Sequence, residues 1–214
     1  MLLQANDISH SFDTLLYEGV NLALNRAESI AILGVSGSGK STLLANLSTL
    51  LAPKSGRVGI LEHSDIYALK SAERLRLLRY EIGVIFQAHY LFRGFSTIEN
   101  LQVGSILAKE RLDMALLESL GIAHTLAQSS ADLSGGQQQR LSIARVLLKK
   151  PRIIFADEPT GNLDKTTAHS VMDAITGYLR ANAAGLIIAT HDEEIANKCD
   201  KIYRIHKQGL ESIK

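Results

Sequence analysis

The chain has 214 residues and a formal net charge of +1, and 46% of its residues are hydrophobic. These values exclude a globally disordered chain and argue against a nucleic-acid-binding protein, because such proteins usually carry a strong basic bias. The single cysteine, Cys199, excludes an intramolecular disulfide. We see no secretory signal and no run of about 18 apolar residues, so we expect contact with a membrane only through a partner.

The first part of the chain is predicted to alternate short strands with helices. Partial alternation or continuous apolar runs predict strands over residues 2–9, 16–24, 29–33 and 82–87, and residues 53–60 are predicted to form a turn followed by a strand. Helical spacing predicts helices over residues 42–51 and 71–79, and Ser71 is the expected cap of the second helix.

The remainder of the chain is predicted to be helical at first and then to return to strands. Apolar residues recur at helical spacing over residues 97–108, 111–122 and 137–150. Two buried strands follow, over residues 152–158 and 185–191, with a helix over 165–182 between them and a final strand and hairpin over 200–212. Both buried strands end in polar groups. In a parallel sheet the carboxyl ends of the strands are where ligands bind, so we expect a site at that edge.

A glycine-rich loop, GVSGSGKS over residues 34–41, matches the pattern G-x-x-x-x-G-K-[ST]. Its glycines let successive N–H groups converge on phosphate oxygens, and the helix that follows adds its positive amino end. Lys40 should reach the β- and γ-phosphates, and the Ser41 hydroxyl should bind Mg²⁺. The residues predicted to hold the nucleotide are Gly34, Val35, Ser36, Gly37, Ser38, Gly39, Lys40, Ser41 and Thr42.

Polar residues at the ends of three predicted strands complete this site. Asp157 and Glu158 end the run IIFADE, where an aspartate can hold Mg²⁺ through water and the next carboxylate can polarise an attacking water. His191 ends the neighbouring strand and is expected to contact the γ-phosphate. Gln87 ends the strand at 82–87, where its amide can bind Mg²⁺ or water and sense the nucleotide. We therefore predict catalytic roles for Glu158, His191 and Gln87, and Mg²⁺ binding by Ser41, Gln87 and Asp157.

A second glycine motif, LSGGQ, occupies residues 133–137 at the start of a predicted helix. It resembles the signature of the nucleotide-binding subunits of ATP-binding cassette (ABC) transporters. The motifs FQ, ADEPT, NLD and THD also stand in the order found in that family, at residues 86–87, 156–160, 162–164 and 190–192. The resemblance covers nearly the whole chain, which is identified as a member of this family.

The resemblance implies a fold and an activity. The expected fold is α/β, with a RecA-like phosphate-loop core, a mixed but mostly parallel sheet, an N-terminal antiparallel β subdomain and a helical subdomain inserted at about residues 88–150. These parts would form one nucleotide-binding domain over residues 1–214. The implied activity is hydrolysis of ATP with Mg²⁺, coupled to movement of a transmembrane permease.

The resemblance also implies a head-to-tail dimer. ATP held by the glycine loop of one subunit would be covered by the signature of the other, so that two ATP molecules lie between the subunits. Whether the second subunit is another copy or a related ATPase stays open. The residues expected to reach the partner's ATP are Ser134, Gly135, Gly136, Gln137 and Asp164.

One aromatic residue is expected to stack on the adenine. Phe12 is aligned with the residue that has this role in the family, and Tyr17 is the alternative. Three further aromatics, Tyr90, Phe92 and Phe95, either pack in the core of the helical subdomain or line a groove for a cytoplasmic helix of the permease.

The stretches LRYEIGVIFQAHYLFRGFSTIENL and ADEPTGNLD resemble one branch of the family, which serves lipoprotein release, macrolide and peptide export and bacterial cell division. This resemblance implies a peripheral position on the cytoplasmic face of a bacterial inner membrane. The proline common before the signature in that branch is absent from AQSSADLSGGQ. The alternatives are a soluble ABC ATPase in DNA repair or translation and an ATP-switched regulator of a cell-division complex.

Overall fold

A computed structural model describes the backbone of all 214 residues and the side chains of all except residues 107 and 108. The strands are β1 (Leu3–Ser11), β2 (Leu15–Leu24), β3 (Ser29–Leu33), β4 (Ser55–Ile60), β5 (Ile82–Ile85), β6 (Ile153–Asp157), β7 (Gly185–Thr190), β8 (Lys201–His206) and β9 (Gly209–Ser212). The helices are α1 (Lys40–Leu47), α2 (Ser71–Tyr80), α3 (Thr97–Ala108), α4 (Met114–Ser119), α5 (Gly135–Leu147), α6 (Lys165–Asn182) and α7 (Glu193–Asn197), with a 3₁₀ turn at Ala123–Thr125.

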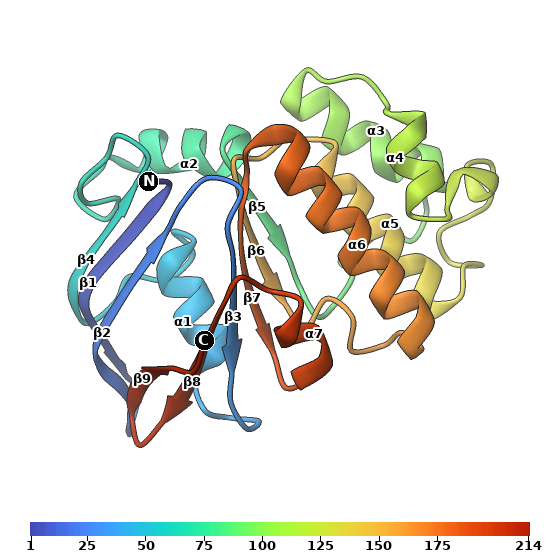
Figure 1. Cartoon of the computed structure of the whole chain (residues 1–214). Coiled ribbons are helices and arrows are strands. Elements are labelled where there is room, and N and C mark those ends of the chain that lie inside the picture. Colours follow the sequence, from blue (N-terminus) through green and yellow to red (C-terminus); the bar gives the residue numbers. More distant parts are fainter.

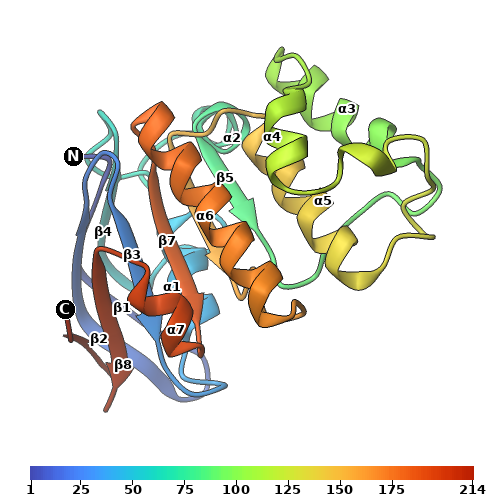
Figure 2. The same cartoon turned by 45° about the vertical axis from the view of Figure 1, so that its right-hand side comes forward.

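The strands form a three-stranded antiparallel sheet, in the order β2-β1-β4, and a six-stranded sheet, in the order β5-β6-β7-β3-β8-β9. The larger sheet is parallel from β5 to β8, and β9 is antiparallel to β8. Figures 1 and 2 show the antiparallel sheet on one side of the molecule and α3, α4 and α5 together on the other. The expected fold class is confirmed, including its antiparallel and helical parts.

Parallel pairing brings the carboxyl ends of the central strands to one edge. Leu33 at the end of β3 pairs with Thr190 at the end of β7, and Asp157 at the end of β6 pairs with Ala189. Every residue of β3 and β7 is buried, which explains why both strands are continuous apolar runs without alternation. This register places the segments that follow β3, β6 and β7 side by side.

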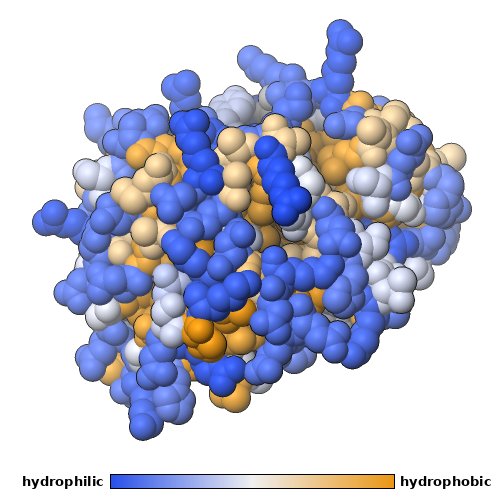
Figure 3. Space-filling view, viewed as in Figure 1, coloured by the Kyte–Doolittle hydropathy of each residue, from blue (hydrophilic) through white to orange (hydrophobic). Residues whose placement is uncertain are grey.

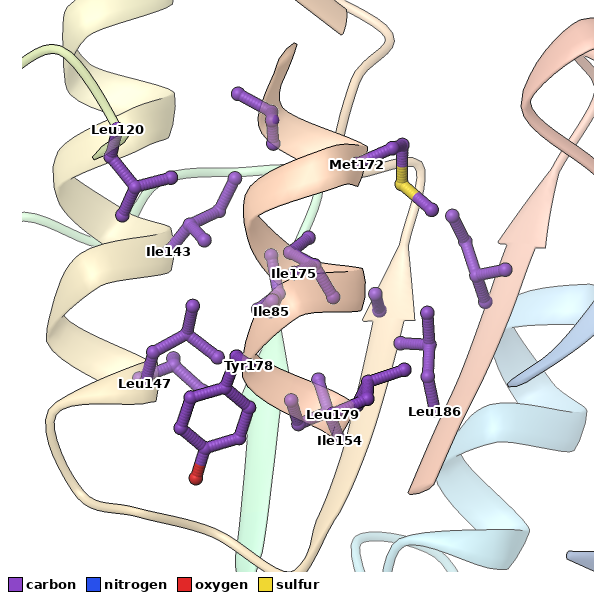
Figure 4. Packing of buried hydrophobic residues seen from close by; sticks show 14 of the residues in the cluster. Ile85, Leu120, Ile143, Leu147, Ile154, Met172, Ile175, Tyr178, Leu179 and Leu186 are labelled. Carbon is purple, nitrogen blue, oxygen red and sulfur yellow. The ribbon is translucent and has the colours of Figure 1, made fainter. Parts of the chain in front are cut away.

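The apolar core has two parts, one on each face of the six-stranded sheet. One cluster joins α5 and α6 to the sheet, and Figure 4 shows Ile143, Ile154 and Ile175 within it. The other joins α1 and the antiparallel sheet to the opposite face, where Phe155 is fully buried. Ile154 and Phe155 are consecutive in β6 but belong to different clusters because side chains along a strand alternate between faces.

Several element ends differ from the predictions for local reasons. Helix α2 begins after Lys70, whose backbone N–H donates to Oε2 of Glu73 over 3.1 Å, so Ser71 is the first helical residue and not the cap. Strand β5 ends at Ile85, which leaves Gln87 in the following loop. Helix α7 was not predicted from the sequence; Asp192 caps it by accepting from two backbone N–H groups.

The surface in the view of Figure 3 is largely hydrophilic, with apolar side chains in small groups between charged ones. Among the helices whose side chains are described, none combines the length and the apolar character that crossing a bilayer requires.

Candidate nucleotide-binding site

The glycine loop leads from the end of β3 into the amino end of α1. Gly37 and Gly39 have φ angles of 79° and 97°, in the left-handed region that strains other residues. A Cβ at Gly39 would also lie 3.3 Å from the Cβ of Leu16. Gly39 caps α1 without any side-chain hydrogen bond. The first N–H groups of the helix are therefore available to an anion.

Lys40, the first residue of α1, is only 7% exposed, and its ammonium points back into the loop. Nζ donates to the carbonyl oxygens of Gly34 and Val35, over 2.8 and 3.1 Å. Both acceptors are neutral carbonyl oxygens, and they hold the ammonium in its nearly buried position. An anionic phosphate in the loop would make a stronger, charge-assisted bond to the same ammonium.

Ser41 and Asp157 lie together at the cavity beside the loop, and the Ser41 hydroxyl favours the charged form of the Asp157 carboxylate. Burial raises the pKa of Asp157 above its usual value, and the nearby charge of Glu158 also raises it; the Ser41 hydrogen bond and Lys40 act in the opposite direction. A divalent cation would favour the ionised carboxylate. Hydroxyl and carboxylate oxygens are ligands that suit Mg²⁺, so these residues fit that ion.

Glu158 follows the last residue of β6 and has a φ angle of 46°, a conformation uncommon outside glycine. Its backbone N–H donates to the carbonyl of Ala189 in β7 over 2.9 Å, which fixes the turn against the neighbouring strand. Its Oε1 accepts from Nδ1 of His191 over 2.9 Å, and Oε2 accepts from the Thr190 hydroxyl over 3.3 Å. The Glu158 side chain is 12% exposed and that of His191 is 70% exposed. A well-oriented carboxylate therefore stands beside an exposed imidazole at the strand ends.

These groups surround one cavity of about 740 Å³, a size typical of small-molecule sites. The residues that line it are Phe12, Leu16, Val35, Ser36, Gly37, Gly39, Lys40, Ser41, Thr42, Gln87, Asp157, Glu158, Gly161 and His191. The predicted loop residues Gly34 and Ser38 do not line it. Leu16 and Gly161 were missed from the sequence; Gly161 stands inside the ADEPTGNLD motif that was already singled out.

The two candidates for the adenine contact differ in exposure. Phe12 is 63% exposed and lies at the cavity. Tyr17 is fully buried, and its hydroxyl donates to Oδ1 of Asn46 in α1. The geometry therefore favours Phe12 over Tyr17 for stacking on a base.

The signature lies outside this cavity. Ser134 caps α5: its hydroxyl accepts from the N–H of Gln137 over 3.3 Å, and its own N–H donates to Oε1 of Gln137 over 2.8 Å. Ser134 and Gly135 are exposed, and a Cβ added to Gly135 would meet nothing within 4 Å. Ser134, Gly135, Gly136 and Gln137 thus form an open helix end outside the cavity that the glycine loop lines.

Asp164 also caps a helix outside the cavity. Its Oδ1 accepts from the N–H of Thr167 over 3.0 Å and its Oδ2 accepts from the Thr167 hydroxyl over 2.6 Å, and these bonds lower the pKa of Asp164. The carboxylate is therefore held in its charged form at the amino end of α6.

A second cavity, of about 560 Å³, lies between α4, α5 and α6. Leu116, Leu147 and Tyr178 contribute to its lining, and none of the phosphate-binding or signature residues reaches it. The glycine loop and the strand-end carboxylates converge on the first cavity, which makes it the candidate nucleotide site.

The three aromatic residues after Gln87 are exposed. The exposed fractions of Tyr90, Phe92 and Phe95 are 67%, 47% and 41%, and the rings of Phe92 and Phe95 stack with centroids 5.3 Å apart. Of the two alternatives for these residues, these exposures contradict packing in the core of the helical part, and the groove for a permease helix stays a prediction.

The parallel sheet, the glycine loop and the strand-end carboxylates define a phosphate-loop ATPase. A comparison with family models matches residues 17–161 to the ABC transporter family. The lipoprotein-releasing system ATP-binding protein LolD of Shewanella frigidimarina is 38% identical over 211 residues, covering 94% of this chain and 88% of that protein. LolD of Xanthomonas campestris pv. campestris is 35% identical over 206 residues, covering 94% and 86%.

Solved structures agree with this assignment. The ATP-binding cassette MJ0796, a dimer in a post-hydrolysis state bound to ADP and Pi, matches with a TM-score of 0.88 at 25% identity and covers 100% of this chain and 99% of its own. The cassette cbiO1 from Clostridium perfringens matches with a TM-score of 0.84 at 30% identity and covers 98% and 86%. The chain therefore belongs to the ABC transporter family. It is an ATP-binding subunit that hydrolyses ATP.

Proposed function

We propose that this chain drives a bacterial lipoprotein-releasing complex, in which two cassettes close around two ATP molecules and move a membrane permease. The observation that carries the proposal is the separation of the two phosphate-binding motifs. The glycine loop lines a cavity together with Glu158 and His191, whereas Ser134 caps an exposed helix end outside it. A second molecule that brings its Ser134 to this cavity would complete the site. The LolD relatives, named for lipoprotein release, support the cargo.

In each site the triphosphate of ATP would lie along the glycine loop, with Lys40 on the β- and γ-phosphates and the adenine against Phe12. Ser41, Asp157 and Gln87 offer a hydroxyl, a carboxylate and an amide oxygen, which suit Mg²⁺. The bound ion would neutralise charge on the β- and γ-phosphates. The amino end of the partner's α5, with its Ser134, Gly135 and Gly136, would add N–H donors from the other side.

Hydrolysis needs a base that accepts a proton from the attacking water and a group that holds the γ-phosphate. Water would attack the γ-phosphorus, the bond from that phosphorus to the bridging oxygen would break, and ADP would leave. Glu158 would accept the proton of the water, for which its buried and doubly held carboxylate is suited. His191 would hold the γ-phosphate, since its side chain is exposed to the cavity while Nδ1 stays on Glu158.

Movement would reach the membrane through the helical part. Tyr90, Phe92 and Phe95 form an exposed aromatic patch in the segment that follows Gln87. Aromatic residues are enriched at protein interfaces, so this patch suits a cytoplasmic helix of the permease. The chain would then lie on the cytoplasmic face of the inner membrane and contact it only through that subunit.

The experiment uses a Glu158→Gln variant, which should bind ATP but hydrolyse it slowly. We expect it to elute as a dimer from size-exclusion chromatography with ATP and Mg²⁺, and as a monomer with ADP. The control is Glu158→Gln combined with Lys40→Ala, which should stay monomeric. A Glu158→Gln variant that binds ATP yet stays monomeric would contradict closure between two copies of this chain.

The permease assignment has its own test. A tagged chain purified from mild detergent should bring with it a membrane protein that has a large extracytoplasmic domain. Recovery of ribosomes or DNA in place of a membrane protein would overturn this part of the proposal.

A further inference from the structure

The loop that leaves the nucleotide cavity is tied by a side chain to the helix that carries the signature. Gln87 lines the cavity, and two residues further His89 contacts the first turn of α5. Nδ1 of His89 lies 3.2 Å from Oε1 of Gln138, although 49 positions separate the two residues. Gln138 directly follows the signature residues Ser134–Gln137. One hydrogen bond thus joins the loop of one phosphate site to the other phosphate-binding motif.

The amide nitrogen of Gln138 binds the segment before the signature. Its Nε2 donates to the carbonyl oxygens of Ser130 and Leu133, over 3.1 and 3.2 Å. Residues 127–132 contain no proline to restrict their backbone. Hydrogen bonds hold this approach, since Ser130 also donates to the carbonyl oxygens of Phe95 and Phe92. Gln138 therefore links His89 to the backbone on the amino-terminal side of Ser134.

These contacts determine the direction of the bond. Nε2 of Gln138 is occupied by two carbonyls, so its oxygen faces His89 and Nδ1 of His89 must be the donor. Nε2 of His89 is buried and has no hydrogen-bond partner among the described side chains. A ring with its donor proton on Nδ1 is therefore the form that fits this contact.

A second tie holds the same loop to α5. The Arg145 guanidinium donates to the carbonyl oxygens of His89 and Tyr90, over 3.3 and 2.9 Å, and lies 5.9 Å from the centre of the Phe92 ring. Arg145 is two helical turns after Gln138, so both residues lie on one face of α5. The loop is therefore bound to α5 at two places along the helix.

We propose that His89 is a positioning residue that carries a displacement of Gln87, at one nucleotide, to the signature that closes on the nucleotide of a second molecule. When Gln87 moves toward bound nucleotide, His89 moves with it and draws the Gln138 amide. Because this amide donates to the carbonyl oxygens of Ser130 and Leu133, the start of α5 is displaced as well. This proposal rests on the proposed function, since it needs the signature to meet a second nucleotide.

The test compares His89→Ala and His89→Asn in the Glu158→Gln background. The asparagine side chain can place an N–H close to the position of Nδ1, whereas alanine cannot. We expect His89→Ala to weaken ATP-dependent dimerisation by about tenfold, because each subunit loses the bond that orders its signature. His89→Asn should restore most of the dimer affinity, measured by analytical ultracentrifugation. Binding of a fluorescent ATP analogue to the monomer should be the same in all these variants.

Two further variants provide a control and a second way to break the contact. His124→Ala removes an exposed histidine from the same helical part and should leave dimerisation unchanged. Gln138→Glu keeps an acceptor for His89 but loses the donor to Ser130 and Leu133, so it should weaken dimerisation as His89→Ala does. The double variant with His89→Ala should be no worse than either change alone, because both break one chain of contacts.

The proposal is overturned if His89→Ala dimerises as tightly as its parent, if it loses nucleotide affinity in the monomer to the same degree, or if His89→Asn does not restore the dimer. Failure of the Glu158→Gln parent to dimerise would instead count against the proposed function. In that case amide hydrogen exchange of the monomer tests whether His89 links Gln87 to the signature. In the monomer that keeps His89, ATP should slow exchange in residues 130–138, and in the His89→Ala monomer it should not. Equal slowing in both monomers would contradict the role proposed for the bond between His89 and Gln138.

Discussion

Nδ1 of His191 and Oε1 of Glu158 lie 2.9 Å apart, although the two residues come from different strand ends and are separated by 33 positions. The register of β6 on β7 produces this contact, since Asp157 pairs with Ala189. The bond orients the Glu158 carboxylate before any nucleotide is present. The His191 side chain remains 70% exposed. Under the proposed function, His191 would hold the γ-phosphate and Glu158 would take a proton from water.

The first prediction concerns His191. His191→Ala should lower kcat for ATP hydrolysis by about 100-fold, because a positioned donor to the transferred phosphate is lost. The KM for ATP should change little, since the glycine loop still binds the nucleotide. Steady-state phosphate release measures both constants. His169→Ala is the matched control, because His169 pairs with Glu194 on the surface, and its rate should equal that of the unaltered chain.

The second prediction concerns Lys40. Lys40→Ala should weaken ATP binding by at least about tenfold, because a charge-assisted bond to the phosphates is lost. Isothermal titration with ATP measures the affinity, and circular dichroism checks that the variant is folded. Lys70→Ala serves as the control, since Lys70 stands at the exposed start of α2 and should not affect binding. Full ATPase activity in Lys40→Ala would contradict the role given to this residue.

The third prediction separates Phe12 from Tyr17. Phe12→Ala should weaken ATP binding by about tenfold or more, since stacking of a base on an aromatic ring contributes roughly 1–3 kcal/mol. The loss should be similar for other purine triphosphates, because stacking does not read the base edge. Tyr17→Phe should keep ATP affinity but lower the free energy of unfolding by about 1–3 kcal/mol, because Asn46 loses a buried hydrogen-bond partner. The reverse pattern would assign the adenine contact to Tyr17.

Elements with strong local signals could be predicted from the sequence almost without error. The apolar run Ser29–Leu33 forms a strand with those bounds, because it is buried on both faces. Helix α6 occupies the predicted residues Lys165–Asn182: Asp164 caps its amino end, and Ala183 ends it in a left-handed conformation. The glycine loop was visible because it needs glycines at fixed places, two of which have positive φ.

Other features depend on contacts between distant segments, which local pattern does not reveal. The five-residue helix α7 is too short to show a period. The left-handed backbone of Glu158 is set by pairing with Ala189 in another strand. The bond between His89 and Gln138 joins a loop to a helix, and neither residue stood out in the sequence. Such features follow from the fold and had to be read from it.

The fourth prediction concerns pH and Lys149, which lies two residues after the end of the helix that carries the signature. Nζ of Lys149 donates to the carbonyl oxygens of Leu78 and Ile82, over 3.0 Å each. Burial lowers the pKa of this ammonium from 10.5 to about 8. Between these values the unfolded chain binds more protons than the folded chain, so the contribution of Lys149 to the free energy of unfolding rises with pH. Below about pH 8 both states are protonated, and burial of the charge opposes folding to its full extent.

The measurement is urea unfolding at about pH 7.5 and about pH 9.5, where the Lys149 contribution should rise by about 2 kcal/mol. Lys149→Met should lack this rise, so the difference between the variant and the unaltered chain should change with pH by that amount. Lys150→Met is the control, because Lys150 is half exposed and pairs with Glu110 over 2.8 Å, and its hydrogen bond to Glu110 raises its pKa. It should keep the rise of the unaltered chain. An equal pH dependence in Lys149→Met and the unaltered chain would show that the ammonium is not held in a desolvated position against the end of α2.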